Sequence, residues 1–144
     1  MKKKKIRNIA LIILGIIVIG GAATGYYLYT KTTPDVAGIT PEYTLTADEL
    51  TQAFNSDEQK ATKKYAGEVI EVSGQIAEKT ANDTSMTFIL TGQKDTSSGV
   101  RCAFSPNALD QAKKYGVGDQ IQVKGKCTGK LFEVILINCY PVND

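Results

Sequence analysis

The hydrophobic residues of this chain follow three successive patterns: a continuous run, then a helical period, then a strict alternation. The continuous run, Ile9 to Leu28, has 20 residues and no charge. At about 1.5 Å per residue, a helix of this length can cross the roughly 30 Å hydrocarbon core of a bilayer. Residues 1–30 are therefore predicted to form a basic tail followed by a transmembrane helix.

The charges before the apolar run predict its orientation. Four lysines at positions 2–5 and Arg7 stand before it. Basic residues favour the cytoplasmic side, so the N-terminus is predicted to be cytoplasmic and the rest of this single-pass protein extracytoplasmic. The alternative is a cleaved signal peptide and a secreted protein, because Gly21-Ala22-Ala23 offers the small residues that a signal peptidase prefers.

The next segment predicts a linker and then two short helices. Residues 31–45 contain prolines and a glycine without any helical period, which is typical of a spacer. The spacing Thr46-Ala-Asp-Glu49 is a capping box, and Leu50 and Phe54 then share one helical face. Ser56-Asp-Glu-Gln59 repeats the capping pattern, which predicts a second helix or a kinked continuation.

From residue 68 the hydrophobic period changes to two, which predicts strands. Apolar and polar residues alternate over Val69–Ile76, Met86–Leu90 and Val100–Phe104. Ser105-Pro106 then has the residues typical of a helix start. Three strands followed by one helix are therefore expected before the last part of the chain.

The last part, Gly118–Cys139, predicts two more strands joined by a tight turn at Gly129-Lys130. Three strands, a helix and two strands are the layout of the OB-fold, a small five-stranded barrel. Glycines inside the first and fourth strands fit a tightly coiled barrel. We therefore predict a mainly β fold with helices: an OB-fold domain over residues 46–144, with an N-terminal helical lead-in.

Three runs of the sequence also carry a resemblance to a known family. They are ADELTQAFNSDEQKATKKYAGEVIEVSGQI, then VRCAF, then GDQIQVKGKCTGKLFEVILINC. Over residues 46–142 the chain resembles the tRNA_anti-like family of small bacterial OB-fold domains, which are often exported or membrane-anchored. The resemblance implies the fold and a bacterial cell membrane, but no defined activity, and the family's name is not evidence of tRNA binding.

Charge and composition argue against two classes of function. Beyond residue 30 the chain has 12 basic and 15 acidic residues, a net charge of −3, whereas a nucleic-acid-binding domain usually carries its own basic surface. The chain has no histidine, the commonest general base and metal ligand. Neither a paired nucleophile and base nor a glycine-rich phosphate loop is evident, so no enzyme activity is expected.

The three cysteines suggest disulfide chemistry rather than a metal site. Cys102, Cys127 and Cys139 form no CxxC motif, so neither a metal nor another cofactor is predicted. Outside the membrane a disulfide is favourable, and Cys127 with Cys139 is the preferred pair. Cys102 with Cys139 is the alternative, and three buried reduced thiols are the third interpretation.

The candidate ligand face consists of Thr87, Ile89, Arg101, Lys124 and Lys126, the outward residues of three strands. This face contains no aromatic ring on which a base could stack. Three hypotheses follow: a membrane-anchored OB-fold module that binds an envelope protein, a peptide or a small molecule; an OB-fold nucleic-acid-binding protein; or a purely structural envelope module.

Overall fold

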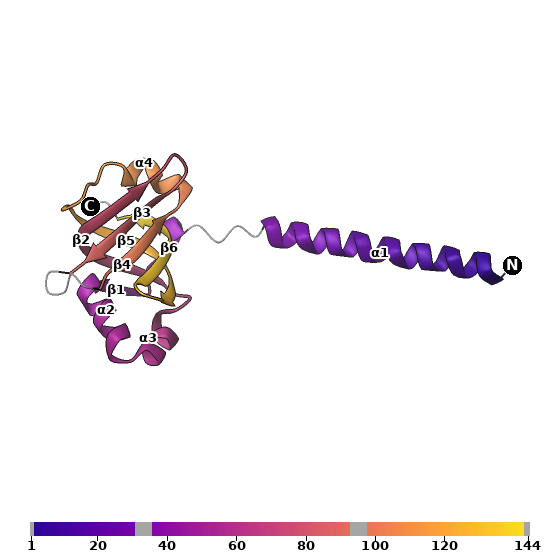
Figure 1. Ribbon diagram of the computed structural model, residues 1–144, viewed down its shortest axis with the longest axis horizontal. Helices are drawn as coiled ribbons and strands as arrows, with labels where there is room; N and C mark the ends of the chain where they lie inside the picture. Colours follow the sequence, from indigo (N-terminus) through magenta and orange to yellow (C-terminus); the bar gives the residue numbers. More distant parts are fainter. Residues whose placement is uncertain (1, 31–35, 93–97, 143–144) are drawn as a thin grey trace. The chain divides into compact units, whose positions relative to one another are not determined.

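The computed structural model describes residues 2–30, 36–92 and 98–142, and the chain forms two compact units, Met1–Pro34 and Asp35–Asp144 (Figure 1). The first unit is one helix, α1 (Lys2–Thr30). Its segment Lys3–Leu28 is long and apolar enough to cross a membrane, and none of it is buried. An apolar N-terminal helix of this kind fits a membrane span or a signal anchor.

The second unit is a closed barrel of five strands, as the alternating pattern predicted. The strands are β2 (Val69–Ala81), β3 (Met86–Thr91), β4 (Val100–Phe104), β5 (Gln120–Lys130) and β6 (Val134–Pro141). They follow one another in the order β2-β3-β4-β6-β5, and antiparallel pairing of β5 with β2 closes the barrel. Only β4 and β6 run parallel among these five strands, so the OB-fold prediction is confirmed.

Short helices cover the two ends of the barrel (Figure 1). At one end lie a 3-10 turn, η2 (Pro106–Ala108), and α4 (Leu109–Ala112), both between β4 and β5 as predicted. At the other end lie α2 (Ala47–Ser56) and α3 (Glu58–Tyr65). The apolar side chains of α2 and of the strands form the core. Within it the Phe88 and Phe104 rings pack edge to face, with their centroids 4.6 Å apart.

The helical lead-in follows its capping signals. Thr46 Oγ1 accepts a hydrogen bond from Glu49 N, and Thr46 N donates to Glu49 Oε2, so the predicted capping box is present. The second helix is capped by Asp57, whose carboxylate accepts from Lys60 N, and not by Ser56. A carboxylate at the N-cap also complements the positive end of the helix dipole, which explains why it replaces the serine.

The described part of the predicted linker belongs to the compact unit. Residues 31–35 lie outside the described residues, but Val36 is buried in a 3-10 turn, η1 (Val36–Gly38). Residues Tyr43–Thr46 form strand β1, which pairs in parallel with β2. Lys124 Nζ donates to the carbonyls of Ala37 and Ile39, each at 2.9 Å. Residues 36–45 are therefore folded against the barrel rather than extended as a spacer.

The turn between β5 and β6 lies later than predicted. β5 continues through Gly129 to Lys130, and the connection is residues 131–133, closed by a hydrogen bond from Leu131 N to Glu133 O. Gly129 has φ of 126°, which only glycine adopts easily, and it bends the strand before the turn. The prediction of a turn at Gly129-Lys130 was wrong because this glycine marks a bend rather than the reversal of the chain.

A β-bulge in β6 sets the direction of Cys139. Lys126 pairs with Ile137 and Lys124 pairs with Tyr140, so Asn138 and Cys139 together face Gly125. Asn138 has φ of 51°, a left-handed conformation that asparagine tolerates. The extra residue lets both Leu136 and Cys139 point into the core, where both are fully buried.

Candidate functional site

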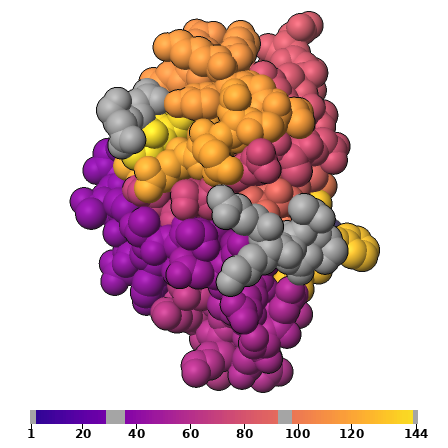
Figure 2. Space-filling model, turned by 90° about the vertical axis from the view of Figure 1, so that its left-hand side faces the viewer, coloured from indigo at the N-terminus to yellow at the C-terminus, as the bar shows by residue number. Residues whose placement is uncertain are grey.

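Two adjoining hollows on the outside of the barrel form an open groove, which we call the polar cleft. Each hollow has a volume of about 390 Å³, and both are lined by Ser73 and Gln120. Figure 2 looks onto the side of the compact unit where the orange segment that leads to Gln120 lies above the purple segment of β1 and the start of α2. The other lining residues are Thr46, Asp48, Gly74, Gln75, Thr91, Gly92, Tyr115, Ile121, Gln122 and Val142.

The polar cleft forms where β2 changes its partner. β1 pairs with β2 as far as Ser73, and β3 pairs with β2 from Gln75 onward, so Gly74 lies in the gap between them. A Cβ atom at Gly74 would lie 2.9 Å from the Thr91 carbonyl and 3.1 Å from the Ala47 Cβ. Glycine at this position therefore lets β1, β3 and the start of α2 approach β2 closely around the notch.

Unused hydrogen-bonding groups line the part shared by the two hollows. Within the described residues, neither the Ser73 hydroxyl nor the Gln120 side-chain amide has a hydrogen-bond partner in the protein. Their neighbours are already engaged: Gln75 Nε2 donates to the Gly118 carbonyl at 3.0 Å, and Gln122 Nε2 donates to Glu71. Ser73 and Gln120 are thus held between fixed amides with donors and acceptors left for a ligand.

The charge of the polar cleft is low and negative. Among the described residues that line it, Asp48 alone is charged, and its carboxylate lies directly against the backbone at Gly92, where any side chain would collide with it. A cleft with neutral donors and acceptors and one acid matches an uncharged polar chain better than a phosphate backbone.

The predicted ligand face is divided between two parts of the barrel. Ile89 on β3 lies directly opposite Arg101 on β4, and Thr87 lies two residues away on the same ladder. Arg101 Nε is bound to Glu133 Oε2 at 2.8 Å, with nearly half of the arginine side chain exposed. These three residues are together, and the arginine is already paired with a carboxylate.

The two lysines of the predicted face lie elsewhere. Lys124 and Lys126 are on β5, and β6 separates β5 from β4. Lys124 holds the carbonyls of η1 and its neighbour, so its ammonium group serves the fold. Lys126 stands between Val69 of β2 and Ile137 of β6. Together with Thr87, Ile89 and Arg101 these lysines do not make one continuous basic surface.

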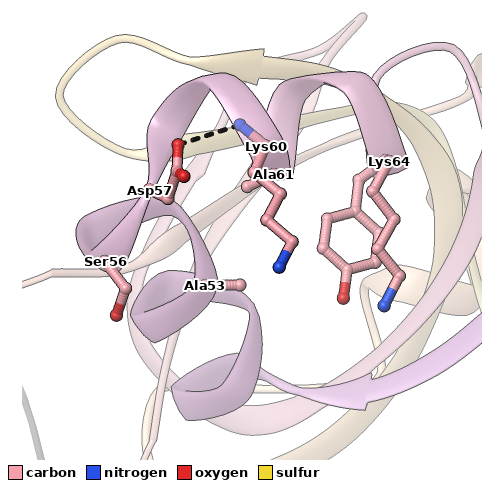
Figure 3. A pocket seen from close by; sticks show the side chains of 7 residues that line it. Ala53, Ser56, Asp57, Lys60, Ala61 and Lys64 are labelled. Carbon is pink, nitrogen blue, oxygen red and sulfur yellow. Dashed lines mark hydrogen bonds between the residues drawn. The ribbon is translucent and has the colours of Figure 1, made fainter.

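A third hollow, of about 300 Å³, lies between α2 and α3. Figure 3 shows the side chains of Lys60 and Lys64 extending into it from α3, with Ser56 and Asp57 at its rim. The Lys64 ammonium group lies 5.1 Å from the centre of the Tyr43 ring and 5.0 Å from that of Tyr65. The hollow therefore has a cationic side, which is stabilised by cation–π contacts.

The cysteines are buried free thiols. Cys127 pairs with Leu136 on the neighbouring strand, whereas the Cys139 thiol interacts with the thiol of Cys102. Burial, and then the proximity of Cys102, raises the pKa of Cys139 well above its usual value. Burial also raises the pKa of Cys127, against a smaller lowering by a backbone hydrogen bond at Gly129. The Cys127–Cys139 pairing and its alternative, Cys102–Cys139, both stay predictions.

The sequence did not single out the residues of the polar cleft. Four of its polar residues alternate with buried residues along β2 and β5, which is the pattern of any strand with one face in solvent. These residues are Ser73, Gln75, Gln120 and Gln122. Only the pairing of β2 with β5 brings the four side chains onto one surface. Among the described residues, no group of three His, Cys, Asp or Glu side chains could hold a metal ion.

One solved structure superposes well enough to support this fold. A lipoprotein from Klebsiella pneumoniae, for which nucleic-acid binding has been suggested, superposes with a TM-score of 0.59 at 15% identity, covering 79% of this chain and 100% of that one. The asparaginyl-tRNA synthetase of Pyrococcus horikoshii matches with a TM-score of 0.42 at 13% identity, covering 56% and 20% of the two chains. No curated protein sequence matches this chain. Because the sequence model of the family matches residues 1–140, the chain belongs to the tRNA_anti-like family.

Proposed function

We propose that this protein is a membrane-anchored, extracytoplasmic binding module without enzyme activity, and that its polar cleft binds an extended polypeptide segment of an envelope protein. The observation that supports this is the pair of adjoining hollows with unused groups on Ser73 and Gln120. An extended backbone presents alternating N–H and C=O groups, which a hydroxyl and an amide side chain can satisfy together. The open form of the cleft suits a chain that passes along it.

The anchor is the second part of the proposal. The apolar segment Lys3–Leu28 and the basic residues before it support a cytoplasmic N-terminus and an external barrel. The mass of the protein extracted from membranes tests this, because an uncleaved anchor keeps residues 1–30. Protease added to intact spheroplasts should then digest the barrel. A shortened, soluble protein would replace the anchor with a cleaved signal peptide, and a protected barrel would reverse the orientation.

Site-specific photo-crosslinking in living cells tests the cleft. A benzophenone side chain at Gln120 of the full chain should capture a discrete protein, and Ser73→Arg should abolish the product by filling the shared part of the cleft. Benzophenone at Asp110, an exposed position on α4, is the matched control. Equal products at both positions, or a Gln120 product that survives Ser73→Arg, would contradict the proposal.

Nucleic acid is the competing class of ligand. The likeness to the Klebsiella lipoprotein at 15% identity supports only the shared fold. Arg101 is paired with Glu133, and Phe88 and Phe104 are core residues, so the described outer surface of β3 and β4 offers no stacking platform. We expect no retention of labelled single-stranded oligonucleotides on filters at low salt. Retention that weakens steeply with added salt would favour the nucleic-acid hypothesis.

A further inference from the structure

The connection between β5 and β6 places two large apolar side chains in solvent. Phe132 is 96% exposed and Leu131 is 79% exposed, the highest values among the described large hydrophobic residues. We call residues 131–133 the β5–β6 tip. Single exposed apolar residues are common, but two adjacent ones at the apex of a hairpin form a projecting apolar patch.

The β5–β6 tip is held in place from both sides. On one side Glu133 binds Arg101 of β4 at 2.8 Å, and on the other Lys130 Nζ donates to the Asn55 side chain at the end of α2. The hydrogen bond from Leu131 N to Glu133 O closes the turn itself. These three contacts present Phe132 in a defined position rather than leaving it free to fold back onto the barrel.

Cationic groups lie at the same end of the barrel. The Lys130–Asn55 contact joins the tip to the α2–α3 end, where Lys60 and Lys64 extend into their hollow (Figure 3). Within the described residues, neither of these two ammonium groups has a carboxylate partner. An apolar apex beside basic side chains is the combination that binds a lipid surface with anionic headgroups.

The covalent connection to α1 favours the membrane over a soluble partner. Only residues 31–35 join α1 to the part of the compact unit that begins with the buried Val36. Five residues reach at most about 18 Å when fully extended. An anchor in the bilayer therefore keeps the barrel close to the headgroups, where an exposed phenylalanine and leucine can enter the interface.

We propose that the β5–β6 tip inserts Leu131 and Phe132 into the outer interface of the membrane that anchors the protein, with the lysines of the α2–α3 end next to anionic headgroups. This inference rests on the anchored form of the proposed function. Insertion would give the barrel a fixed orientation, because the tip is at one end of β5 and Gln120 of the polar cleft is at the other.

The absence of tryptophan from the chain allows a direct test. Phe132→Trp gives one fluorophore at the tip, and Val117→Trp gives one at an exposed apolar residue, 64% exposed, in the connection between α4 and β5. Each full-length variant is placed in nanodiscs of phosphatidylcholine and phosphatidylglycerol with brominated acyl chains. We expect emission from position 132 to fall about twofold or more relative to unbrominated discs, as for a ring a few ångströms below the headgroups, and emission from position 117 to stay unchanged.

The outcomes separate the inference from the proposed function. Co-elution of the chain with the nanodiscs without quenching at position 132, or with equal quenching at both positions, overturns tip insertion and leaves the anchor standing. A tryptophan at 132 that is shielded from both bromine and aqueous iodide is covered by protein, which also overturns it. Failure to co-elute with the discs refutes the anchor, and tip insertion with it. Leu131→Glu in the Phe132→Trp background should restore the lost emission.

Discussion

The fit of Cys139 against Gly125 gives the sharpest test of the barrel. A Cβ atom at Gly125 would lie 2.6 Å from Cys139 Sγ, 3.2 Å from the Ile137 carbonyl oxygen and 3.3 Å from the Leu136 Cβ. Atoms in contact normally lie about 3.5–4.0 Å apart. Gly125→Ala therefore requires the buried thiol to move by about 1 Å within a closed core.

The expected loss of stability follows from these distances. Overpacking of this degree costs about 1–3 kcal/mol, and a forced change of the Cys139 rotamer falls within that range. The φ of Gly125 is not in the left-handed region, so alanine would otherwise stabilise by about 0.4–1 kcal/mol through the unfolded chain. We expect a net loss of about 1–2 kcal/mol, which shifts the urea midpoint down by about 1 M.

Urea unfolding of the full chain in mild detergent, followed by near-ultraviolet circular dichroism, measures this change. Cys139→Ala removes the colliding sulfur, so Gly125→Ala should cost about 1 kcal/mol less in that background than in the wild type. Gly116→Ala is the matched control, because its Cβ would lie no closer than 3.8 Å to its nearest neighbour. If Gly125→Ala is neutral or stabilising, or costs the same with and without the Cys139 thiol, the close contact is refuted.

Three further predictions concern a helix cap, a clamp and a buried thiol. Thr46→Ala removes the capping box of α2 and should lower the free energy of unfolding by about 1 kcal/mol, whereas Thr44→Ala on the same strand should not. Lys124→Met releases the carbonyls of Ala37 and Ile39, so limited proteolysis should cut residues 36–42 faster; an unchanged rate would mean that Val36 alone holds the segment. Because burial raises the pKa of Cys139, its thiol contributes full stability below the unfolded pKa of about 8.5, and that contribution falls as the pH rises toward the folded pKa. As the pH rises from 7 to 10, the free energy of unfolding should therefore fall more in the wild type than in Cys139→Ala. Parallel curves of this free energy against pH would contradict the buried position of the thiol.

The barrel could be predicted because its signals are local. Alternation along Val69–Ile76 and the other strands reflects one buried and one exposed face, and the capping box of Thr46 and Glu49 acts over one helical turn. β1 could not be predicted, because its four residues pair in parallel with a strand more than twenty residues later. Nothing in Tyr43–Thr46 alone indicates that partner.

The turn and the bulge were missed for a related reason. Leu131 and Phe132 are apolar, which is typical of residues inside a strand, but both are exposed and form the apex of the connection before β6. Asn138 in an otherwise apolar run was the available sign of a bulge, since asparagine tolerates φ > 0. Its consequence, that Leu136 and Cys139 both face the core three residues apart, departs from the alternation of a regular strand.

The candidate site depends on contacts that the sequence does not encode locally, and these same contacts connect its parts mechanically. β5 carries Gln120 of the polar cleft at its start and leads into the β5–β6 tip at its end, and Lys124 between them binds the carbonyls of η1. A strand paired on both sides, with β2 and with β6, transmits orientation as a rigid element. If the β5–β6 tip inserts as proposed, the inserted end of β5 therefore sets the direction in which the polar cleft opens. Phe132→Glu should leave the folded barrel intact and yet weaken photo-capture at Gln120 if that orientation matters for binding.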